Sequence, residues 1–129
     1  MNVFRKAERL CSKKQIELLF SQGRVAFVFP FKIFYRITDA KAAPRITPCQ
    51  VMISVPKRHF KKAVVRNLLK RRTREAFRLH KQSLAAALPA QGKHLQLVLY
   101  YACETVLPYV SLAEAMKKAN HLLIQQVEL

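Results

Sequence analysis

The chain has 129 residues, 51% of them hydrophobic, so it is long enough and apolar enough to form one compact domain with a buried core. Its 24 Lys and Arg residues against 7 Asp and Glu residues give a formal net charge of +17, which indicates a polyanionic partner, nucleic acid before an anionic membrane. No apolar run approaches the ~18–20 residues that span a bilayer, and no lipidation or signal-peptide pattern is visible.

The cysteines exclude two further classes of protein. Cys11, Cys49 and Cys103 are odd in number and widely spaced along the chain. This pattern matches neither a disulfide framework nor a zinc site. We therefore expect a reduced, cytoplasmic protein with incidental thiols. We also expect that the protein binds no metal or cofactor tightly.

The first predicted element is a short amphipathic helix over residues 12–22. Ser12 and the following residues to Gln15 form a capping-box pattern before an apolar run. Gly23 stands where a left-handed cap would end this helix. Residues 1–8, ahead of it, are expected to be loosely ordered.

Two strands are predicted next. Alternation predicts one strand over residues 27–38, with Pro30 near its start, and a second strand over residues 51–55 that ends at Pro56. The polar segment 39–48, which holds two prolines, is predicted to be the loop between them. The first strand has one face with Phe31, Ile33, Tyr35 and Ile37 and another with Lys32, Phe34, Arg36 and Thr38. The second face suits either nucleic acid, because a ring stands among cations, or ordinary solvent exposure.

The rest of the chain predicts two helices separated by a strand. A basic connection over residues 57–62 leads into a long helix over residues 63–88, which Pro89 and Gly92 end. A strand over residues 94–103 follows, with Leu95, Leu97, Leu99 and Tyr101 on one side. The capping-box pattern Ser111-Leu112-Ala113-Glu114 predicts the start of a final helix, whose apolar set is Leu112, Ala115, Met116, Ala119, Leu122 and Leu123.

Together these elements predict a single α+β domain over residues 1–129, a two-layer sandwich of helices on a small mixed or antiparallel sheet. Residues 125–129 are expected to be a loose end.

The stretch 57–81 is the most informative part of the chain for function. It holds 11 of the 24 basic residues and a single acid, Glu75. On a helical wheel, an arc of about 140° collects Arg66, Asn67, Lys70, Arg71, Arg74 and Arg78. The opposite arc collects Val64, Val65, Leu68, Leu69, Ala76 and Leu79. Arg outnumbers Lys on the polar face, which favours bidentate phosphate binding, and one acid cannot balance so many cations.

The acidic and histidine residues argue against a self-contained ribonuclease. Seven acids are scattered along the chain and form no carboxylate cluster of the kind that holds two catalytic metal ions. His59, His80, His94 and His121 lack the local pairing expected of an acid–base pair. We therefore expect the protein to act by binding. A generic RNA-binding protein, ribosome-associated or of the RNA-chaperone type, remains an alternative, and a DNA-architectural role is a more distant one.

The run from Lys61 to Arg78, with its core Arg66-Asn67-x-x-Lys70-Arg71-x-x-Arg74, resembles the signature of the bacterial ribonuclease P protein component. The matching segments are, in chain order, Glu8-Arg9-Leu10 with Phe20 and Gly23, then Phe31–Tyr35 and Val51–Arg58. The resemblance covers residues 8–124. It implies the element order α-β-β-(β)-α-β-α with a left-handed β-α-β crossover, an exception to the usual handedness.

The resemblance also implies partners and sites. The partners are the catalytic RNA of ribonuclease P and precursor tRNA, whose 5′ leader the complex removes, with Mg²⁺ held mainly by RNA; no membrane or obligate protein partner is expected. The implied contacts with the RNA subunit are Lys57, Arg58, Lys61, Lys62, Arg66, Asn67, Lys70, Arg71 and Arg74. The implied leader cleft comprises Ile16, Phe20, Lys32, Phe34 and Arg36.

Two positions of the signature depart from the family pattern. The family usually has Arg where this chain has Leu68, and an aliphatic residue where it has Arg72. Because these positions are one helical turn apart, our hypothesis is that charge and apolar group have exchanged places, which shifts one phosphate contact. Ile16 also stands where the family commonly has an aromatic residue.

Overall fold

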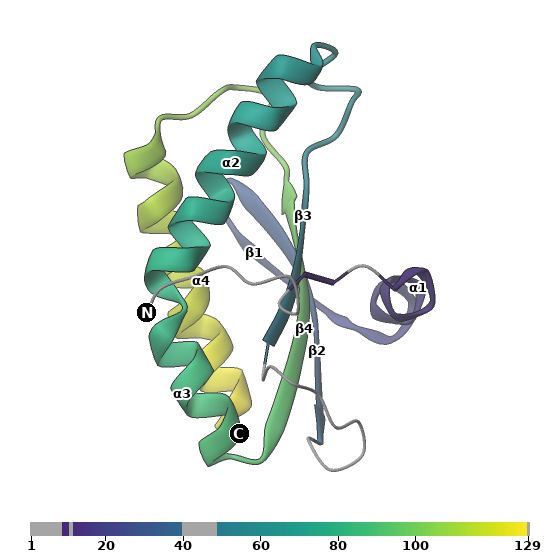
Figure 1. Cartoon of the computed structure of the whole chain (residues 1–129), viewed down its shortest axis with the longest axis vertical. Coiled ribbons are helices and arrows are strands. Elements are labelled where there is room, and N and C mark those ends of the chain that lie inside the picture. The colour runs from purple at the N-terminus through teal and green to yellow at the C-terminus, as the bar shows by residue number, and fades with distance from the viewer. Residues whose placement is uncertain (1–8, 11, 40–48, 129) are drawn as a thin grey trace.

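The computed structural model describes residues 9–10, 12–39 and 49–128 of the chain. Its elements are α1 (Lys13–Gln22), β1 (Arg24–Val28), β2 (Phe31–Asp39), β3 (Cys49–Ser54), α2 (Ala63–His80), α3 (Gln82–Ala90), β4 (Lys93–Tyr101) and α4 (Tyr109–Val127). The strands form one sheet in the order β1-β2-β4-β3, in which β3 and β4 are parallel and the other neighbours antiparallel. Helices α2, α3 and α4 cover one face, and α1 lies on the opposite face (Figure 1). The predicted α+β class and mixed sheet are confirmed.

The aromatic segment after α1 is a β-hairpin, so the prediction of one strand over residues 27–38 was wrong. β1 pairs antiparallel with β2 along all 5 of its residues. The turn between the two strands contains Phe29 and Pro30, joined by a cis peptide bond. The prediction placed Pro30 near the start of a strand, whereas it lies in the turn, where no ladder donor is needed.

The long helix predicted over residues 63–88 is divided into α2 and α3. The buried side chain of Asn120, on α4, donates a hydrogen bond to the carbonyl of His80 at the C-terminal end of α2. Carbonyls in the last turn of a helix lack partners within the helix, so this bond stabilises the end of α2. No Gly or Pro lies near the break, and for this reason the local pattern missed it.

A main core lies between the sheet and helices α2, α3 and α4. The predicted inward faces of β2 and β4 are confirmed, because Phe31, Ile33, Tyr35, Leu95, Leu97, Leu99 and Tyr101 are all buried. The helices contribute Leu69, Phe77, Leu84, Leu88, Leu112, Met116 and Leu123. Burial of each large side chain contributes roughly 1.5–3 kcal/mol, so this core fixes the orientation of α2.

A smaller core attaches α1 to the other face of the sheet. Its buried members are Leu10, Leu19 and Val98, and Ile16, Phe34 and Met52 pack against them. The predicted cap at Ser12 is confirmed, since its hydroxyl accepts a hydrogen bond from the backbone N–H of Gln15. Helix α1 is therefore fixed over the sheet by its apolar side.

Gly23 ends α1 for a different reason from the one predicted. Its φ of −77° is not left-handed. Its N–H donates to the carbonyl of Leu19, and a Cβ at this position would lie 2.3 Å from that oxygen. Glycine is thus required by close approach and not by a left-handed cap.

Both predicted ends of the final helix were wrong. α4 begins at Tyr109, after Pro108, so Ser111 lies inside the first turn and does not open the helix. At the other end α4 continues through Val127, which is only 2% exposed. Residues 125–127 therefore form part of the helix rather than a loose end.

The connection from β3 to its parallel neighbour β4 runs through α2 and α3, as the family resemblance implies. Its left-handedness stays a prediction. Residues 1–8, expected to be loose, and residues 40–48 of the predicted loop lie outside the described part of the chain. None of the described helices is long and apolar enough to cross a membrane.

Candidate nucleic-acid interface

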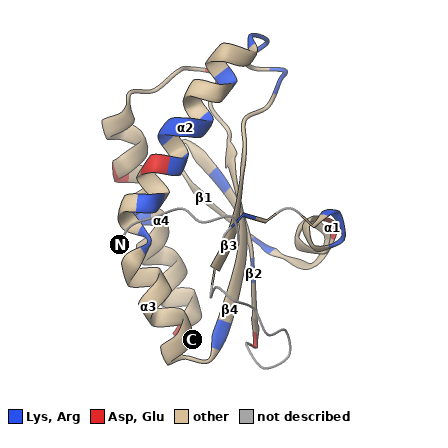
Figure 2. Ribbon diagram, viewed as in Figure 1, with Lys and Arg blue, Asp and Glu red and all other residues tan. Residues whose placement is uncertain are grey.

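The outward side of α2 carries cations with a single acid among them (Figure 2). Asn67, Arg71 and Arg74 are exposed, and Lys70 is partly exposed. Within the described residues, no hydrogen bond or ion pair occupies these four side chains. They are therefore available to an external anion.

The buried face of α2 is rotated by about a quarter of a turn from the predicted one. Its buried residues are Leu69, Thr73, Ala76 and Phe77, whereas Val64, predicted to be apolar and inward, is 80% exposed. The large ring of Phe77 faces the core, and the hydroxyl of Thr73 is satisfied there by the carbonyl of Leu69. The rotation brings Arg66 and Lys70 to the edge of the packed face, where both are partly buried.

The side chain of Arg66 forms hydrogen bonds within the protein. Its Nη1 donates to the carbonyls of Phe60 and Lys61, at 2.7 and 2.9 Å, and so ties the loop before α2 to the helix. A guanidinium has five N–H donors, so three remain after these two bonds. Arg66 can therefore position the loop and still bind a phosphate.

Arg78 was predicted to lie on the free basic face, but it is paired. Its Nε donates to Oε2 of Glu75 at 3.0 Å, and Nη2 contacts the other carboxylate oxygen. This hydrogen bond lowers the pKa of Glu75 and raises that of Arg78. The one acid of the stretch thus neutralises the cation three residues later.

Arg72 also has a partner within the chain. Its Nη1 donates a hydrogen bond to the carbonyl of Leu107 at 2.9 Å. The N–H of the same residue, Leu107, donates to the hydroxyl of the Tyr101 ring. Burial of this ring raises the pKa of Tyr101. Arg72 therefore holds the segment before α4, and the proposed exchange with Leu68 stays a prediction.

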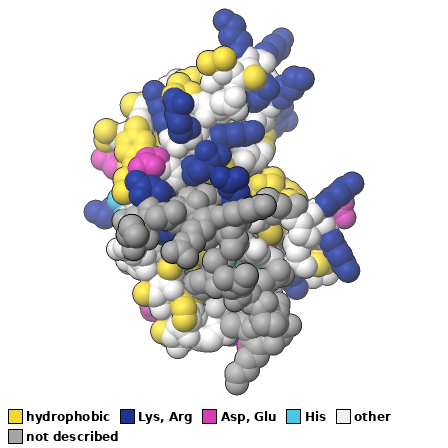
Figure 3. Space-filling view, viewed as in Figure 1, with side chains coloured by type: hydrophobic (Ala, Val, Ile, Leu, Met, Phe, Trp, Pro, Cys, Tyr) yellow, Lys and Arg dark blue, Asp and Glu magenta, His cyan; other side chains and the backbone are white. Residues whose placement is uncertain are grey.

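The loop before α2 extends the cationic surface. Lys57, Arg58, Lys61 and Lys62 are exposed. In Figure 3, Lys and Arg side chains gather over the region of α2 and above it, with a second group at α1. Arg58 turns toward the sheet, where Nη2 donates to the hydroxyl of Tyr100 at 3.3 Å. We call the nine implied RNA contacts, from Lys57 to Arg74, the basic surface.

The five residues implied for the leader share one region, on the α1 side of the sheet, and we call them the aromatic site. The rings of Phe20 and Phe34 meet edge to face with centroids 4.8 Å apart. Nζ of Lys32 lies 5.3 Å from the centroid of Phe34, within cation–π range. Arg36 follows on the same strand face, while Ile16 packs into the small core under α1.

Sequence reasoning missed two rings beside this site. Phe27 of β1 and Tyr100 of β4 both lie opposite Lys32 in the strand register, one on each side of it. Phe27 is 60% exposed. The alternation of β4 would have predicted Tyr100 on this face, but placing Phe27 there depends on recognising the hairpin at Pro30.

Among the described residues, no three His, Cys, Asp or Glu side chains are grouped closely enough to hold a metal ion.

Comparison with known proteins identifies the family. Residues 4–124 match the family model described as Ribonuclease P. The chain belongs to the ribonuclease P protein family. A ribonuclease P protein component from Chlorobaculum tepidum is 34% identical over 128 residues, which cover 95% of this chain and 81% of that protein. One from Porphyromonas gingivalis is 29% identical over 114 residues, covering 88% of this chain and 81% of that protein.

Solved ribonuclease P proteins share the fold. The protein from Staphylococcus aureus superposes with a TM-score of 0.66 at 19% identity and covers 92% of this chain and 96% of its own. The protein from Thermotoga maritima gives a TM-score of 0.65 at 24% identity with the same coverage. As a ribonuclease P protein component, this chain takes part in tRNA processing as an RNA-binding member of an endoribonuclease complex.

Proposed function

We propose that this ribonuclease P protein docks on the large catalytic RNA through its basic surface and holds the 5′ leader of precursor tRNA in its aromatic site. The RNA carries the chemistry and holds most of the Mg²⁺. The protein screens repulsion between the phosphates of the two RNAs and adds contacts that raise substrate affinity. The complex acts in the cytoplasm.

The observation that supports leader binding is the cluster of Phe20, Phe34 and Lys32 on the face of the sheet opposite α2. Phe20 is 48% exposed although it is aromatic, and a cation lies beside its neighbour. Single-stranded nucleic acid binds where bases can stack on rings while cations follow the backbone. A separate face for the leader leaves the outward side of α2 for the RNA subunit.

The basic surface is suited to a structured RNA because its cations stand on a packed helix. Arg71 and Arg74 project from α2, whose inner side is held by Leu69 and Phe77. Arg66 fixes the loop that carries Lys61 and Lys62. Guanidinium groups held in this way bind phosphate with less loss of side-chain freedom than mobile ones do.

The deciding experiment is reconstituted processing of precursor tRNA at low Mg²⁺ concentration. Protein alone, catalytic RNA alone and their mixture are compared for release of the 5′ leader. We expect efficient processing only in the mixture. Cleavage by protein alone would show a self-contained nuclease, and no gain in the mixture would show a general RNA-binding protein.

A second measurement separates the two surfaces. Affinity for catalytic RNA is measured without substrate, and affinity of the assembled complex is measured for precursor and mature tRNA. We expect changes in the basic surface to alter the first affinity, and changes in the aromatic site to alter only the preference for precursor over mature tRNA. Substitutions in the aromatic site that weaken both substrates equally would refute leader binding there.

A further inference from the structure

A pocket at the edge of the sheet lies outside the basic surface and shares one residue with the aromatic site. It has a volume of about 400 Å³ and is lined by residues of α1, β1, β2, β4 and α4. Among its described lining residues are three cations, Arg24, Arg36 and Lys93, two glutamines and no acid. Only Arg36 belongs to the aromatic site, and the pocket therefore continues from the end of that site.

The strand register explains why a pocket forms here. β1 begins at Arg24, opposite Tyr35, so β2 continues beyond it to Asp39 without a β1 partner. On its other side β2 remains paired with β4 as far as Lys93. An unpaired strand edge presents backbone N–H and C=O groups to a ligand.

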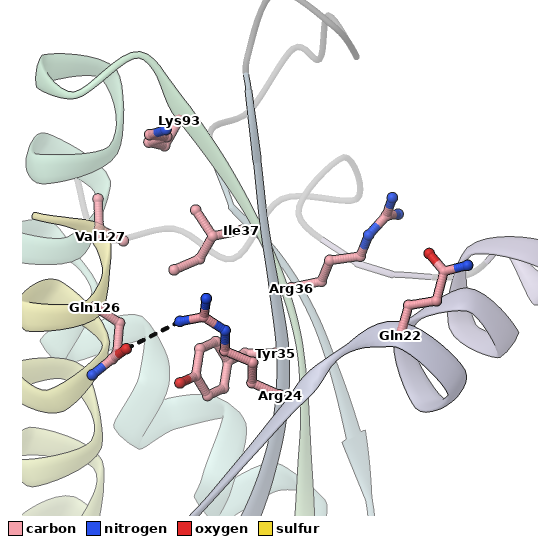
Figure 4. A pocket seen from close by; sticks show the side chains of 8 residues that line it. All are labelled: Gln22, Arg24, Tyr35, Arg36, Ile37, Lys93, Gln126 and Val127. Atoms are coloured by element: carbon pink, nitrogen blue, oxygen red, sulfur yellow. Dashed lines mark hydrogen bonds between the residues drawn. The ribbon is translucent and has the colours of Figure 1, made fainter. Parts of the chain in front are cut away.

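The side chains lie on both sides of this open edge. In Figure 4, Arg24 and Lys93 lie on the α4 side of β2, and Arg36 and Gln22 lie on the α1 side. Arg24 donates to Oε1 of Gln126 at 3.4 Å, which directs its guanidinium along the pocket wall. A chain that leaves the aromatic site at Arg36 can therefore pass over the edge of β2 and meet two more cations.

The charges select the kind of ligand. Within the described part of the chain, no carboxylate lies within ion-pair distance of Arg24, Arg36 or Lys93. The nearest acid in the ladder is Asp39, opposite Lys93, and it is not part of the pocket wall. Three cations, two glutamine amides and a strand edge that β1 does not pair suit the phosphodiester backbone of single-stranded RNA.

We infer that this pocket binds phosphates of the precursor-tRNA leader beyond the nucleotides held in the aromatic site. The inference rests on the proposed leader function and extends it. It predicts that leaders long enough to reach Arg24 and Lys93 bind more tightly than leaders that end within the aromatic site. The RNA subunit is the other possible source of phosphate, and it is distinguished by dependence on leader length.

The test uses the reconstituted complex and precursor tRNAs whose leaders are lengthened one nucleotide at a time. Arg24→Gln combined with Lys93→Gln is expected to weaken binding of long-leader substrates on the order of fivefold and to lower the salt dependence by about 0.7 per lost phosphate contact. Short-leader substrates are expected to bind unchanged. Arg24→Lys with Lys93→Arg retains both charges and is expected to restore long-leader binding.

The matched control is Lys117→Gln with Lys118→Gln, which removes two exposed charges from α4. Equal loss for short and long leaders, or weaker binding to catalytic RNA alone, would overturn the inference. So would unchanged binding at every leader length while thermal melting shows a folded protein.

Phe34→Ala, measured with the same series of leaders, separates failure of the inference from failure of the proposed leader function. If Phe34→Ala weakens leader binding and the pocket variant does not, the inference fails and the leader function stands. If Phe34→Ala has no effect on any leader, leader binding in the aromatic site fails.

Discussion

The basic surface and the aromatic site stand on the two sides of one sheet and use cations in different ways. Around α2, Arg66, Arg72 and Arg78 are held by groups of the chain itself, and their neighbours Arg71 and Arg74 project freely. In the aromatic site, by contrast, Lys32 lies against the ring of Phe34. Free cations on a fixed helix suit phosphates, and rings beside a cation suit unpaired bases.

Charge count alone therefore overstates the number of cations that have no partner within the protein. The stretch 57–81 has 11 cations, but Arg72 and Arg78 lie in contacts that stabilise the protein. Their role is to hold the helix and the segment before α4. The exposed cations Arg71 and Arg74 are carried on a helix that is fixed in this way.

The largest expected effect comes from removing the free cations of α2. Lys70→Gln, Arg71→Gln and Arg74→Gln together are expected to weaken binding to catalytic RNA on the order of 10- to 100-fold and to flatten the salt slope, because each lost phosphate contact removes released counterions. Arg66 is left intact, since it also holds the loop. Titration at several salt concentrations measures both quantities. An unchanged slope would contradict phosphate contacts on this face.

Phe34→Ala is the corresponding change in the aromatic site. We expect a loss of ~1–3 kcal/mol in leader binding with the salt slope unchanged, because stacking releases no counterions. Binding of precursor and mature tRNA to the assembled complex measures it. Phe34→Tyr is the control, because it keeps the ring. Equal losses for both tRNAs would mean that Phe34 only packs against α1.

Phe27→Ala examines whether the aromatic site extends to β1. We expect about 1 kcal/mol of lost leader affinity and little change in stability, because the ring is 60% exposed. Phe29→Ala is a matched control, since Phe29 has the same exposed fraction but lies in the turn. Leader affinity and melting temperature are measured for both variants. Equal effects of the two substitutions would place Phe27 outside the site.

The smallest expected effect on RNA binding comes from exchanging Leu68 and Arg72. Leu68→Arg with Arg72→Leu removes the hydrogen bond to Leu107, so we expect a loss of about 1 kcal/mol in the free energy of unfolding. Affinity for catalytic RNA is expected to change less than tenfold. Denaturant unfolding and RNA titration check the two expectations. Weakening of RNA binding by tenfold or more would refute an equivalent exchange.

Much of the architecture was predictable from local pattern. Alternation correctly placed the inward side chains of β2 and β4, and Ser12 correctly marked the start of α1. Two errors came from Pro30, which was assigned to a strand, and from Ser111, whose capping pattern lies inside α4. In both cases the residue does lie close to a turn or to the start of a helix, but not at the position that the local pattern predicted.

The candidate site was also predictable in part. The order Arg66-Asn67-x-x-Lys70-Arg71-x-x-Arg74 led to the family from sequence alone, and the family model confirms it. The availability of each cation was not predictable, because Arg72 meets Leu107 across 35 residues of chain. The neighbourhood of Phe27 and Lys32 likewise depends on how the hairpin pairs.

The amino-acid sequence by itself determined that the protein is a cationic α+β domain of the ribonuclease P family with a patterned basic helix. These properties follow from composition, periodicity and the order of neighbouring residues, all of which are local. Only the tertiary structure decided where α2 ends, which of its sides is buried, which cations are free and that a pocket opens beside β2. The reason is physical: each of these features is set by contacts between segments far apart in the chain, such as Asn120 with His80, which no local pattern contains.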